Sequence, residues 1–426
     1  MARKPSVTPA RRSASKSLAR KTPAPPAAKA TKPTGATPHY GKNAPPGTKT
    51  INLALQGGGA HGAFAWGVLD HLLEDGRLRF EGVSGTSAGS MNAVVLAYGL
   101  HMDGAKGAQL ALENFWKAVS DAGQRYSPVR SMPWDRHMGK WNNDDSLGFQ
   151  AFKAMTAAFS PYQLNPLNFN PLRDVLTEQV DFDELNSCEH LKLFLSATNV
   201  QSGNVRVFNT EEVTADVVMA SACLPFLYQS VEIDGQTYWD GGYMGNPALF
   251  PLFYNTDARD VLIVHINPIA RKGNPTTPHE IDDRVNEITF NSALIKELRA
   301  VAFVQKLLDE GWLKPAFKDR MKYVLIHSLR ADHALGDLSA ASKLCTDWDF
   351  LCMLRDRGRE AAKEWLKENY QHIGKKQTVD LQKEFLNSGS EMRELKGRPL
   401  SKREKAATTK VPVVPVPKAK AKAKSG

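Results

Sequence analysis

The chain has 426 residues, 42% of them hydrophobic, which is enough for one large core or two smaller ones. Its net charge of +10 is carried by the ends: residues 1–49 hold eleven Lys or Arg and no acid, residues 396–426 carry a net +9, and residues 50–395 therefore carry −10. This distribution excludes a basic globular domain, so attraction to nucleic acid or anionic lipid is a property of the tails.

The two ends have the composition of disordered tails. Residues 1–49 are mainly Ala, Pro, Lys, Thr and Ser, and residues 373–426 end in "VPVVPVPKAKAKAKSG". Such segments cannot bury enough apolar surface to offset their chain entropy. We therefore expect one globular region over residues 50–372, with a disordered basic tail on each side.

The globular region opens with a short apolar run at residues 51–56, which predicts a buried strand. It continues into Gly57-Gly58-Gly59-Ala60-His61-Gly62, and residues 60–75 have the apolar spacing of a helix. Glycines between a strand and a helix N-terminus let backbone N–H groups point at an anion. That anion is either the oxyanion of a tetrahedral intermediate or a phosphate, because the loop also fits the dinucleotide pattern G-x-G-x-x-G, with Glu81 near the position of a ribose-binding acid.

A second glycine-rich turn follows one strand later. Residues 80–84 predict a strand and residues 90–100 a helix, and between them lies Gly85-Thr86-Ser87-Ala88-Gly89. G-x-S-x-G in a strand-to-helix turn is typical of a nucleophile elbow, which exposes the serine hydroxyl near a helix N-terminus that favours negative charge. The same letters also describe a turn with a capping serine, and at Gly and Ser frequencies of about 7% they arise by chance in roughly one chain in seven of this length.

Strands and helices continue to alternate in the rest of the globular region. The patterns predict helices at about 109–122, 280–310 and 342–370, strands at 191–200, 205–209, 260–268 and 322–330, and a hairpin at 231–240. This alternation favours a three-layer α/β/α sandwich around a mostly parallel central sheet.

Asp240-Gly241-Gly242 follows the hairpin directly. Asp-Gly-Gly is a common turn, so the pattern by itself has a purely structural explanation. A serine hydroxyl needs a base, however, and a desolvated carboxylate within hydrogen-bond reach can supply one.

Taken together, these three blocks resemble the patatin-like phospholipases of the bacterial type. That family has a glycine-rich loop, then G-x-S-x-G, then Asp-Gly-Gly or Asp-Gly-Ala, in this order. The segments "SATNVQSGNVRVF" and "MASACLPFLYQSVEIDGQTYWDGGYMGNPAL" also resemble the family's blocks around the Asp. The resemblance is dense over about residues 51–253 and weaker to about 330, and the order and joint spacing of the motifs make it specific.

The resemblance implies a lipid acyl hydrolase, a phospholipase A or lysophospholipase-like esterase that needs no metal and no organic cofactor. Ser87 would be the nucleophile and Asp240 the base of a dyad without histidine, and Gly57, Gly58 and Gly59 would offer N–H groups to the oxyanion. The motifs would be supported by His61, Gly62, Gly85, Gly89, Gly241 and Gly242. The family usually has Arg or Lys at position 61, where a histidine could add a group that titrates near neutral pH.

An insertion rich in aromatic side chains, Pro and Asn occupies residues 126–172. It is either a lid over an acyl pocket or an extra subdomain with ordinary core packing. Among the histidines after Asp240, His265, His279, His327 and His333 stand in the order that a Ser–Asp–His triad requires. Because the Asp-Gly-Gly context already explains Asp240, we do not expect a catalytic histidine.

Several absences bear on the location of the protein. The four cysteines, Cys188, Cys223, Cys345 and Cys352, form neither a disulfide framework nor a C-x-x-C metal pattern, which favours a reducing compartment. No apolar stretch approaches the about 18 residues of a membrane span, and no apolar segment follows Arg11-Arg12 to make an export signal. We expect a cytoplasmic protein whose basic tails allow peripheral contact with an anionic membrane, a lipid granule or nucleic acid.

Two other functions stay open on the sequence alone. A nucleotide-binding protein would use the glycine loop at residues 57–62, and a non-catalytic protein associated with a membrane or lipid granule would act through its tails. A nucleotide-binding protein would not lose its function on Ser87→Ala, whereas a hydrolase would.

Overall fold

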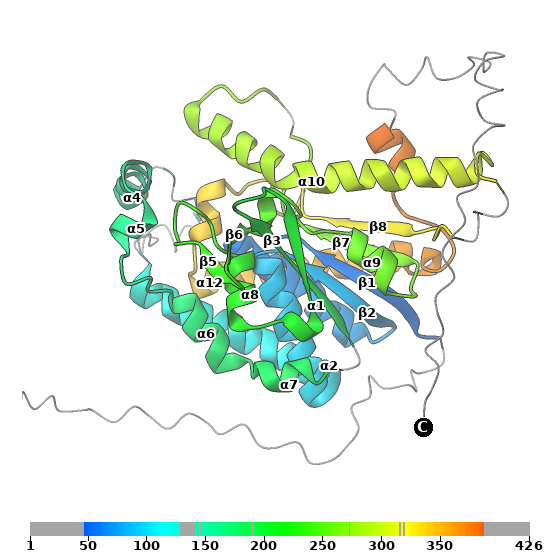
Figure 1. The fold of residues 1–426 in the computed structure, drawn as a ribbon, viewed down its shortest axis with the longest axis horizontal. Coiled ribbons are helices and arrows are strands. Elements are labelled where there is room, and N and C mark those ends of the chain that lie inside the picture. Colours follow the sequence, from blue (N-terminus) through cyan, green and yellow to red (C-terminus); the bar gives the residue numbers. More distant parts are fainter. Residues whose placement is uncertain are drawn as a thin grey trace, which may run out of the picture. The chain divides into compact units, whose positions relative to one another are not determined.

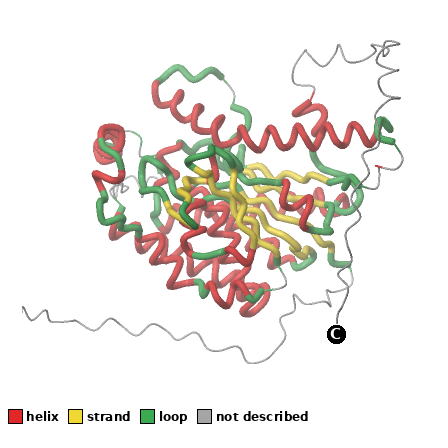
Figure 2. The backbone as a smooth tube through the Cα atoms, viewed as in Figure 1, coloured by secondary structure: helices red, strands yellow, loops and turns green. Residues whose placement is uncertain are grey.

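A mixed sheet of eight strands lies at the centre of the fold, with helices around it (Figure 2). The computed structural model describes residues 47–386 except 128–140, 143, 145, 189–190, 272, 315–316 and 318–319, and the described residues belong to one compact unit, Thr37–Gly426. The disorder expected at residues 1–46 and 387–426 therefore falls outside the described residues.

The sheet has a parallel centre and an antiparallel edge. Its order is β5-β6-β3-β2-β1-β7-β8, with β4 also paired to β3. Strands β3, β2, β1, β7 and β8 are parallel to their neighbours in that series, whereas β4, β6 and β5 are joined antiparallel. The strands are β1 Lys49–Leu55, β2 Leu78–Gly85, β3 Lys192–Asn199, β4 Val205–Asn209, β5 Val231–Ile233, β6 Gln236–Asp240, β7 Asp260–His265 and β8 Leu325–Arg330.

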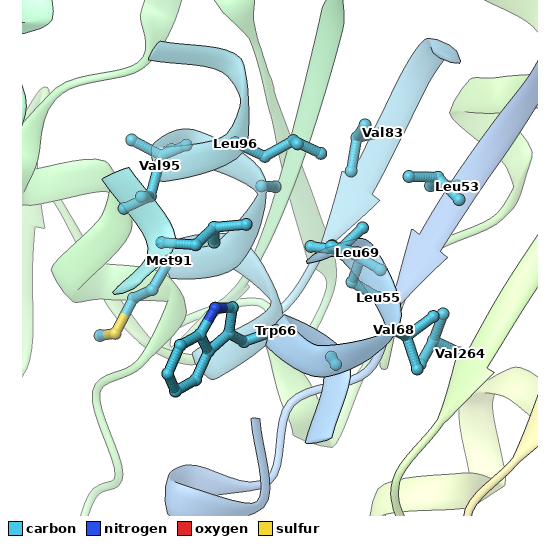
Figure 3. Close-up of a cluster of buried hydrophobic side chains, with 14 of the residues drawn as sticks. Leu53, Leu55, Trp66, Val68, Leu69, Val83, Met91, Val95, Leu96 and Val264 are labelled. Atoms are coloured by element: carbon cyan, nitrogen blue, oxygen red, sulfur yellow. The ribbon is translucent and has the colours of Figure 1, made fainter. Parts of the chain in front are cut away.

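Alternate residues of the central strands face two different cores. Leu53 and Leu55 of β1 pack in a large core with helices α1, α2 and α12, and Figure 3 shows this packing against Trp66, Leu69 and neighbouring side chains. Ala54, between them, belongs to a second core with α9 and α10. Because successive strand side chains point to opposite faces, helices cover both sides of the sheet, and the predicted three-layer sandwich is confirmed (Figure 1).

The helices in chain order are α1 Gly62–Asp75, α2 Ala88–Tyr126, α4 Leu147–Ala158, α5 Pro161–Leu164, α6 Pro171–Gln179, α7 Phe182–Asn186, α8 Ala215–Ser221, α9 Phe250–Asn255, α10 Pro278–Asp309 and α12 Trp348–Asn369. Short turns of helix, η1 Gly59–His61, η3 Gly241–Tyr243, η4 Ala340–Leu344 and η6 Gln382–Leu386, lie between or after them. None of the described helices has both the length and the apolar character to cross a membrane.

Three predicted helices differ from the observed ones. The helices expected at 90–100 and 109–122 are two halves of α2, which bends at Asp103 and Gly104, where the backbone leaves helical angles. The helix expected at 342–370 begins at Trp348, because residues 340–344 form the separate turn η4 and Asp347 adopts extended angles as the N-cap of α12.

The globular region extends beyond both predicted boundaries. Lys49, assigned from composition to the N-terminal tail, is the first residue of β1, and its ammonium donates to the carbonyls of Tyr370 and Ile373 at 2.6 and 3.0 Å. At the other end, Val379, Leu381 and Phe385 are buried in the second core. These apolar residues stand among Lys, Asp and Gln without regular spacing, so the sequence pattern did not reveal them.

We expect Phe385→Ala to destabilise the protein by about 3–5 kcal/mol, because it empties a buried aromatic site in the second core. Lys383→Ala, on the exposed side of the same turn, is the matched control and should change the free energy of unfolding by no more than about 0.5 kcal/mol. Urea unfolding of both variants measures the difference. Equal midpoints would mean that residues 373–386 do not belong to the folded unit.

Candidate active site

Ser87 stands in a sharp turn between β2 and α2. Its backbone has φ 55° and ψ −123°, a conformation that a non-glycine residue rarely adopts and that is typical of a nucleophile elbow. The Ser87 N–H donates to Ser221 Oγ at 3.0 Å, and the Ser87 carbonyl accepts from the N–H groups of Ser90 and Met91 at the start of α2. These bonds hold the strained residue, which lines a large cavity.

The glycines of the elbow lie where the backbone leaves no room for a side chain. A Cβ on Gly89 would overlap the Leu55 carbonyl of β1, and a Cβ on Gly85 would come within 2.6 Å of the Gly89 carbonyl. The other supporting glycines are equally confined, by Ala88 at Gly62, by the Ser196 carbonyl at Gly241 and by Phe290 at Gly242. Close packing of the elbow against β1 and α1, and of the turn after Asp240 against β3 and α10, therefore requires glycine at these positions.

Strand β3 brings Asp240 next to Ser87. Gly85, at the end of β2, pairs with Leu195 on one side of β3, and Asp240, at the end of β6, pairs with Ala197 on the other. A single strand thus connects Ser87 and Asp240, which stand far apart in the sequence. The Asp240 backbone is fixed further by its N–H, which donates to Cys223 O at 2.7 Å.

The Asp240 carboxyl is fully buried, and burial raises its pKa from 3.8 to about 7. Its Oδ1 accepts a hydrogen bond from Gly242 N at 2.7 Å, and the Ser87 hydroxyl also lowers the pKa, so these two groups offset part of the effect of burial. Oδ2 makes no hydrogen bond of standard geometry to any described residue. A contact that influences the pKa without full hydrogen-bond geometry is common between catalytic groups before substrate binds.

The glycine loop differs from the sequence prediction at one residue. The Gly57 N–H donates to Asn246 Oδ1 at 2.7 Å, so it is already engaged and does not face an oxyanion freely. Gly59, with φ +58°, is exposed and lines the same cavity as Ser87. Asn246 lies far along the chain from Gly57, which is why the loop sequence did not reveal this bond.

His61 does not act as a group that titrates near neutral pH. Its side chain is buried, and burial, together with the nearby charge of Lys343, lowers its pKa from 6.5 to about 3. The Ser342 hydroxyl donates to Ser339 O, so His61 Nε2–H donates to Ser342 Oγ at 2.7 Å. His61 is a neutral residue that joins η1 to η4.

Ser87 lies in the wall of a cavity of about 620 Å³. One face of α2 lines it with Phe115, Val119 and Ala122, and many of the other lining residues are apolar side chains from the segments 152–172 and 222–228. This volume is in the range of small-molecule sites, and the predominantly apolar lining suits a hydrocarbon chain.

Comparison with known proteins agrees with this geometry. Residues 53–253 match the family model described as patatin-like phospholipase. The chain carries a patatin-like phospholipase domain. The activity associated with this family is the hydrolysis of acyl groups from lipids. No curated protein sequence matches the chain.

Two solved structures are similar to the chain at low sequence identity. VipD from Legionella pneumophila is 17% identical, with 73% of this chain and 67% of that chain covered and a TM-score of 0.30. ExoU from Pseudomonas aeruginosa, solved with SpcU, is 15% identical, with 75% of this chain covered and a TM-score of 0.26. The chain spans 53% of the length of that ExoU chain.

The described residues 146–172 of the insertion contribute side chains to the wall of the cavity. Helix α4 has no buried residue, yet Phe152 and Met155 on it line the cavity. Helix α5, which follows α4, is joined to the residue before β5 by a hydrogen bond of 2.8 Å between the hydroxyls of Tyr162 and Ser230. Of the two alternatives left open by the sequence, the described part of the insertion favours the lid, and residues 128–140, 143 and 145 lie outside the described part.

None of His265, His279, His327 and His333 lines the cavity that contains Ser87. His327 pairs with Asp260 at 2.8 Å where β7 begins, and His279 lies 2.9 Å from Asp144. Within the described ranges, no three His, Cys, Asp or Glu side chains are grouped to hold a metal ion.

Ser221 is a residue of the site that sequence reasoning missed. Its Oγ accepts the Ser87 N–H, shares a hydrogen bond of 2.7 Å with Ser90 Oγ, and donates to Ser196 O at 2.7 Å. The residue stood in the recognised segment "MASACLPF", but nothing in the sequence indicated that its hydroxyl holds the elbow.

Replacing Asp240 by Asn should stabilise the domain in a pH-dependent way. Because the pKa of Asp240 is raised from 3.8 to about 7, the folded state keeps a proton that the unfolded chain has lost between these values. The stability of the wild type therefore falls as the pH rises through that window, and the full cost is present above about pH 7. Asn does not titrate, so the melting temperature of Asp240→Asn relative to wild type should be higher at pH 8 than at pH 5.

The matched control is Asp349→Asn, an exposed acid in the first turn of α12. Thermal melts at both pH values test the expectation. A difference between Asp240→Asn and wild type that is the same at pH 5 and pH 8 would contradict a raised pKa at Asp240.

Proposed function

We propose that the chain hydrolyses carboxylic esters of lipids, acting as a phospholipase A or lysophospholipase-like esterase through a Ser87–Asp240 dyad. The observation that carries the proposal is the meeting of a strained, cavity-lining serine with a buried carboxyl whose pKa is about 7. A base with a pKa near the working pH is the most effective kind, because it is largely deprotonated and still accepts a proton readily.

The reaction would proceed in two balanced steps. Ser87 Oγ attacks the ester carbonyl while its proton passes to Asp240 Oδ2, and collapse of the tetrahedral intermediate expels the alcohol, which takes up that proton. Water then attacks the acyl-enzyme and gives a proton to Asp240, and collapse of the second tetrahedral intermediate breaks the bond to Ser87 Oγ, which takes up that proton as the fatty acid leaves. We assign the oxyanion donors to the N–H groups of Gly58 and Gly59, since that of Gly57 is engaged by Asn246.

The nucleotide-binding alternative has less support. Glu81, the acid that would bind a ribose, accepts hydrogen bonds from the N–H groups of Asp257 and Ala258, both at 2.7 Å. Its carboxylate is thus engaged in joining β2 to the turn before β7. The cavity beside the glycine loop is also predominantly apolar, which suits an acyl chain better than a pyrophosphate.

The roles of the tails and the cellular location stay predictions. The basic segments lie outside the described residues, so their contact with an anionic membrane, lipid granule or nucleic acid rests on charge alone. The cytoplasmic location rests likewise on composition.

A fluorophosphonate probe should label the wild-type protein at Ser87, as located by peptide mapping, because such probes react with an activated serine. Ser87→Ala should lose both the label and the hydrolysis of a soluble p-nitrophenyl ester. His279→Ala and His333→Ala, the matched controls for a triad, should keep the label. Loss of label in either histidine variant would contradict the dyad, and turnover by Ser87→Ala would contradict the proposed function.

The cavity should set the acyl-chain preference. Ala122→Trp places a large side chain on the cavity-lining face of α2, so the ratio of kcat/KM for p-nitrophenyl palmitate to that for the butyrate should fall at least about tenfold. Gln124→Trp, exposed on the same helix, should leave the ratio unchanged. An unchanged ratio in Ala122→Trp would show that the acyl chain lies elsewhere.

A further inference from the structure

The carbonyl of the peptide between Gly57 and Gly58 accepts a hydrogen bond from a buried side-chain amide. Asn267, two residues past the end of β7, donates from Nδ2 to Gly57 O at 2.7 Å. The Asn267 backbone is fixed in turn, because its N–H donates to Gln56 Oε1 at 3.1 Å. In a trans peptide the C=O and N–H point in opposite directions, so a carbonyl bound to Asn267 directs the Gly58 N–H away from Asn267.

Lys343 contacts the other end of the same amide. Its ammonium donates to Asn267 Oδ1 and to Asn286 Oδ1, each at 2.9 Å. The residue belongs to η4, directly behind the glycine loop, where a Cβ on Gly59 would overlap the Lys343 carbonyl. Lys343 also lines the cavity that contains Ser87.

The carboxylates near Lys343 are bound by other groups, and the Lys343 ammonium donates its hydrogen bonds to the side-chain amides of Asn267 and Asn286. Glu287 of α10 forms ion pairs with Arg271 at 2.6 Å and Arg284 at 3.1 Å, and Asp283 accepts from Ala340 N. His61, on the side of η1, is neutral. The hydrogen-bond acceptors that the structure records for the Lys343 ammonium, among the described residues, are the two asparagine oxygens.

We propose that Lys343 is a positioning residue that strengthens the oxyanion site through Asn267 and the Gly57–Gly58 peptide. A positive charge on Asn267 Oδ1 makes Nδ2–H a stronger donor to Gly57 O, and that bond makes the Gly58 N–H a stronger donor to the oxyanion. No proton moves along this chain; each amide is only polarised. The inference rests on the proposed function, and it assigns a role to a residue outside the matched segment 53–253.

The first test compares kcat and KM for a soluble p-nitrophenyl ester. Lys343→Met keeps the length of the side chain and removes its charge, and we expect kcat to fall about tenfold with little change in KM, since loss of a complete oxyanion donor costs about 100-fold to 1,000-fold. Lys343→Arg keeps the charge and should recover most of kcat. Lys363→Met, an exposed lysine on α12, is the matched control.

The second test is the pH profile, which a merely structural lysine would not change. The pKa of Lys343 is lowered from 10.5 to about 8, because burial, with a smaller effect of the Arg271 charge, outweighs the opposing effect of the Glu287 and Asp283 carboxylates. The kcat of the wild type should therefore decline above about pH 8, as the charge is lost. This alkaline decline should be absent in Lys343→Met and displaced to higher pH in Lys343→Arg.

The outcomes separate the two hypotheses. If Ser87→Ala abolishes turnover while Lys343→Met keeps the kcat and the alkaline decline of the wild type, the role of Lys343 is wrong and the dyad stands. A loss of kcat that Arg does not recover, together with a lower melting temperature, would also overturn it as a structural effect. If Lys343→Met does not fold, the test uses Lys343→Arg alone. A decline of kcat at the same pH as in the wild type overturns the proposed role of Lys343, and a decline displaced to higher pH supports it.

Discussion

The Asp240 carboxyl lies in the protein interior, where ionisation is opposed by the loss of hydration. The arrangement of the rest of the site depends on this desolvation. Burial raises its pKa to about 7, a value at which a carboxyl exchanges its proton near neutral pH. The Gly242 N–H donates to Oδ1 and offsets part of the desolvation of the carboxylate. The second oxygen, Oδ2, has no hydrogen bond of standard geometry to a described residue. More donors would lower the pKa and weaken the base, and fewer would make an ionised carboxyl still more costly.

The same constraint explains why so much of the fold converges on one turn. The elbow must present Ser87 to a carboxyl that cannot move toward solvent, so its strained backbone is held by Ser221 and by the first turn of α2. Strand β3 fixes the spacing between the two groups, since Gly85 and Asp240 pair with residues two apart on that strand. Rigid β-ladders thus orient the carboxyl that we propose as the base.

Polar groups under the glycine loop extend the site beyond the matched family segment. Asn267 follows β7 and Lys343 belongs to η4, both after residue 253, yet they contact the loop that follows β1. Strand β7 pairs with β1, which places its end beside the glycine loop. The C-terminal third of the described chain is therefore part of the chemical environment of Ser87 as well as part of the core.

The sequence by itself determined the local features: the glycine loop, the G-x-S-x-G turn, the Asp-Gly-Gly turn, and the alternation of strands and helices that predicts a layered fold. These depend on neighbouring residues, because glycine conformations, turn types and apolar periodicity are local properties of the chain. Tertiary structure alone decided the rest. The Gly57 N–H is bound by Asn246, and the Ser87 N–H is bound by Ser221, which lies far along the chain. Packing around His61 lowers its pKa to about 3, and residues 146–172 line the cavity beside Ser87. Each of these features depends on residues that are distant in sequence. Desolvation and hydrogen-bond partners are set by what the fold brings together, and no local pattern records them.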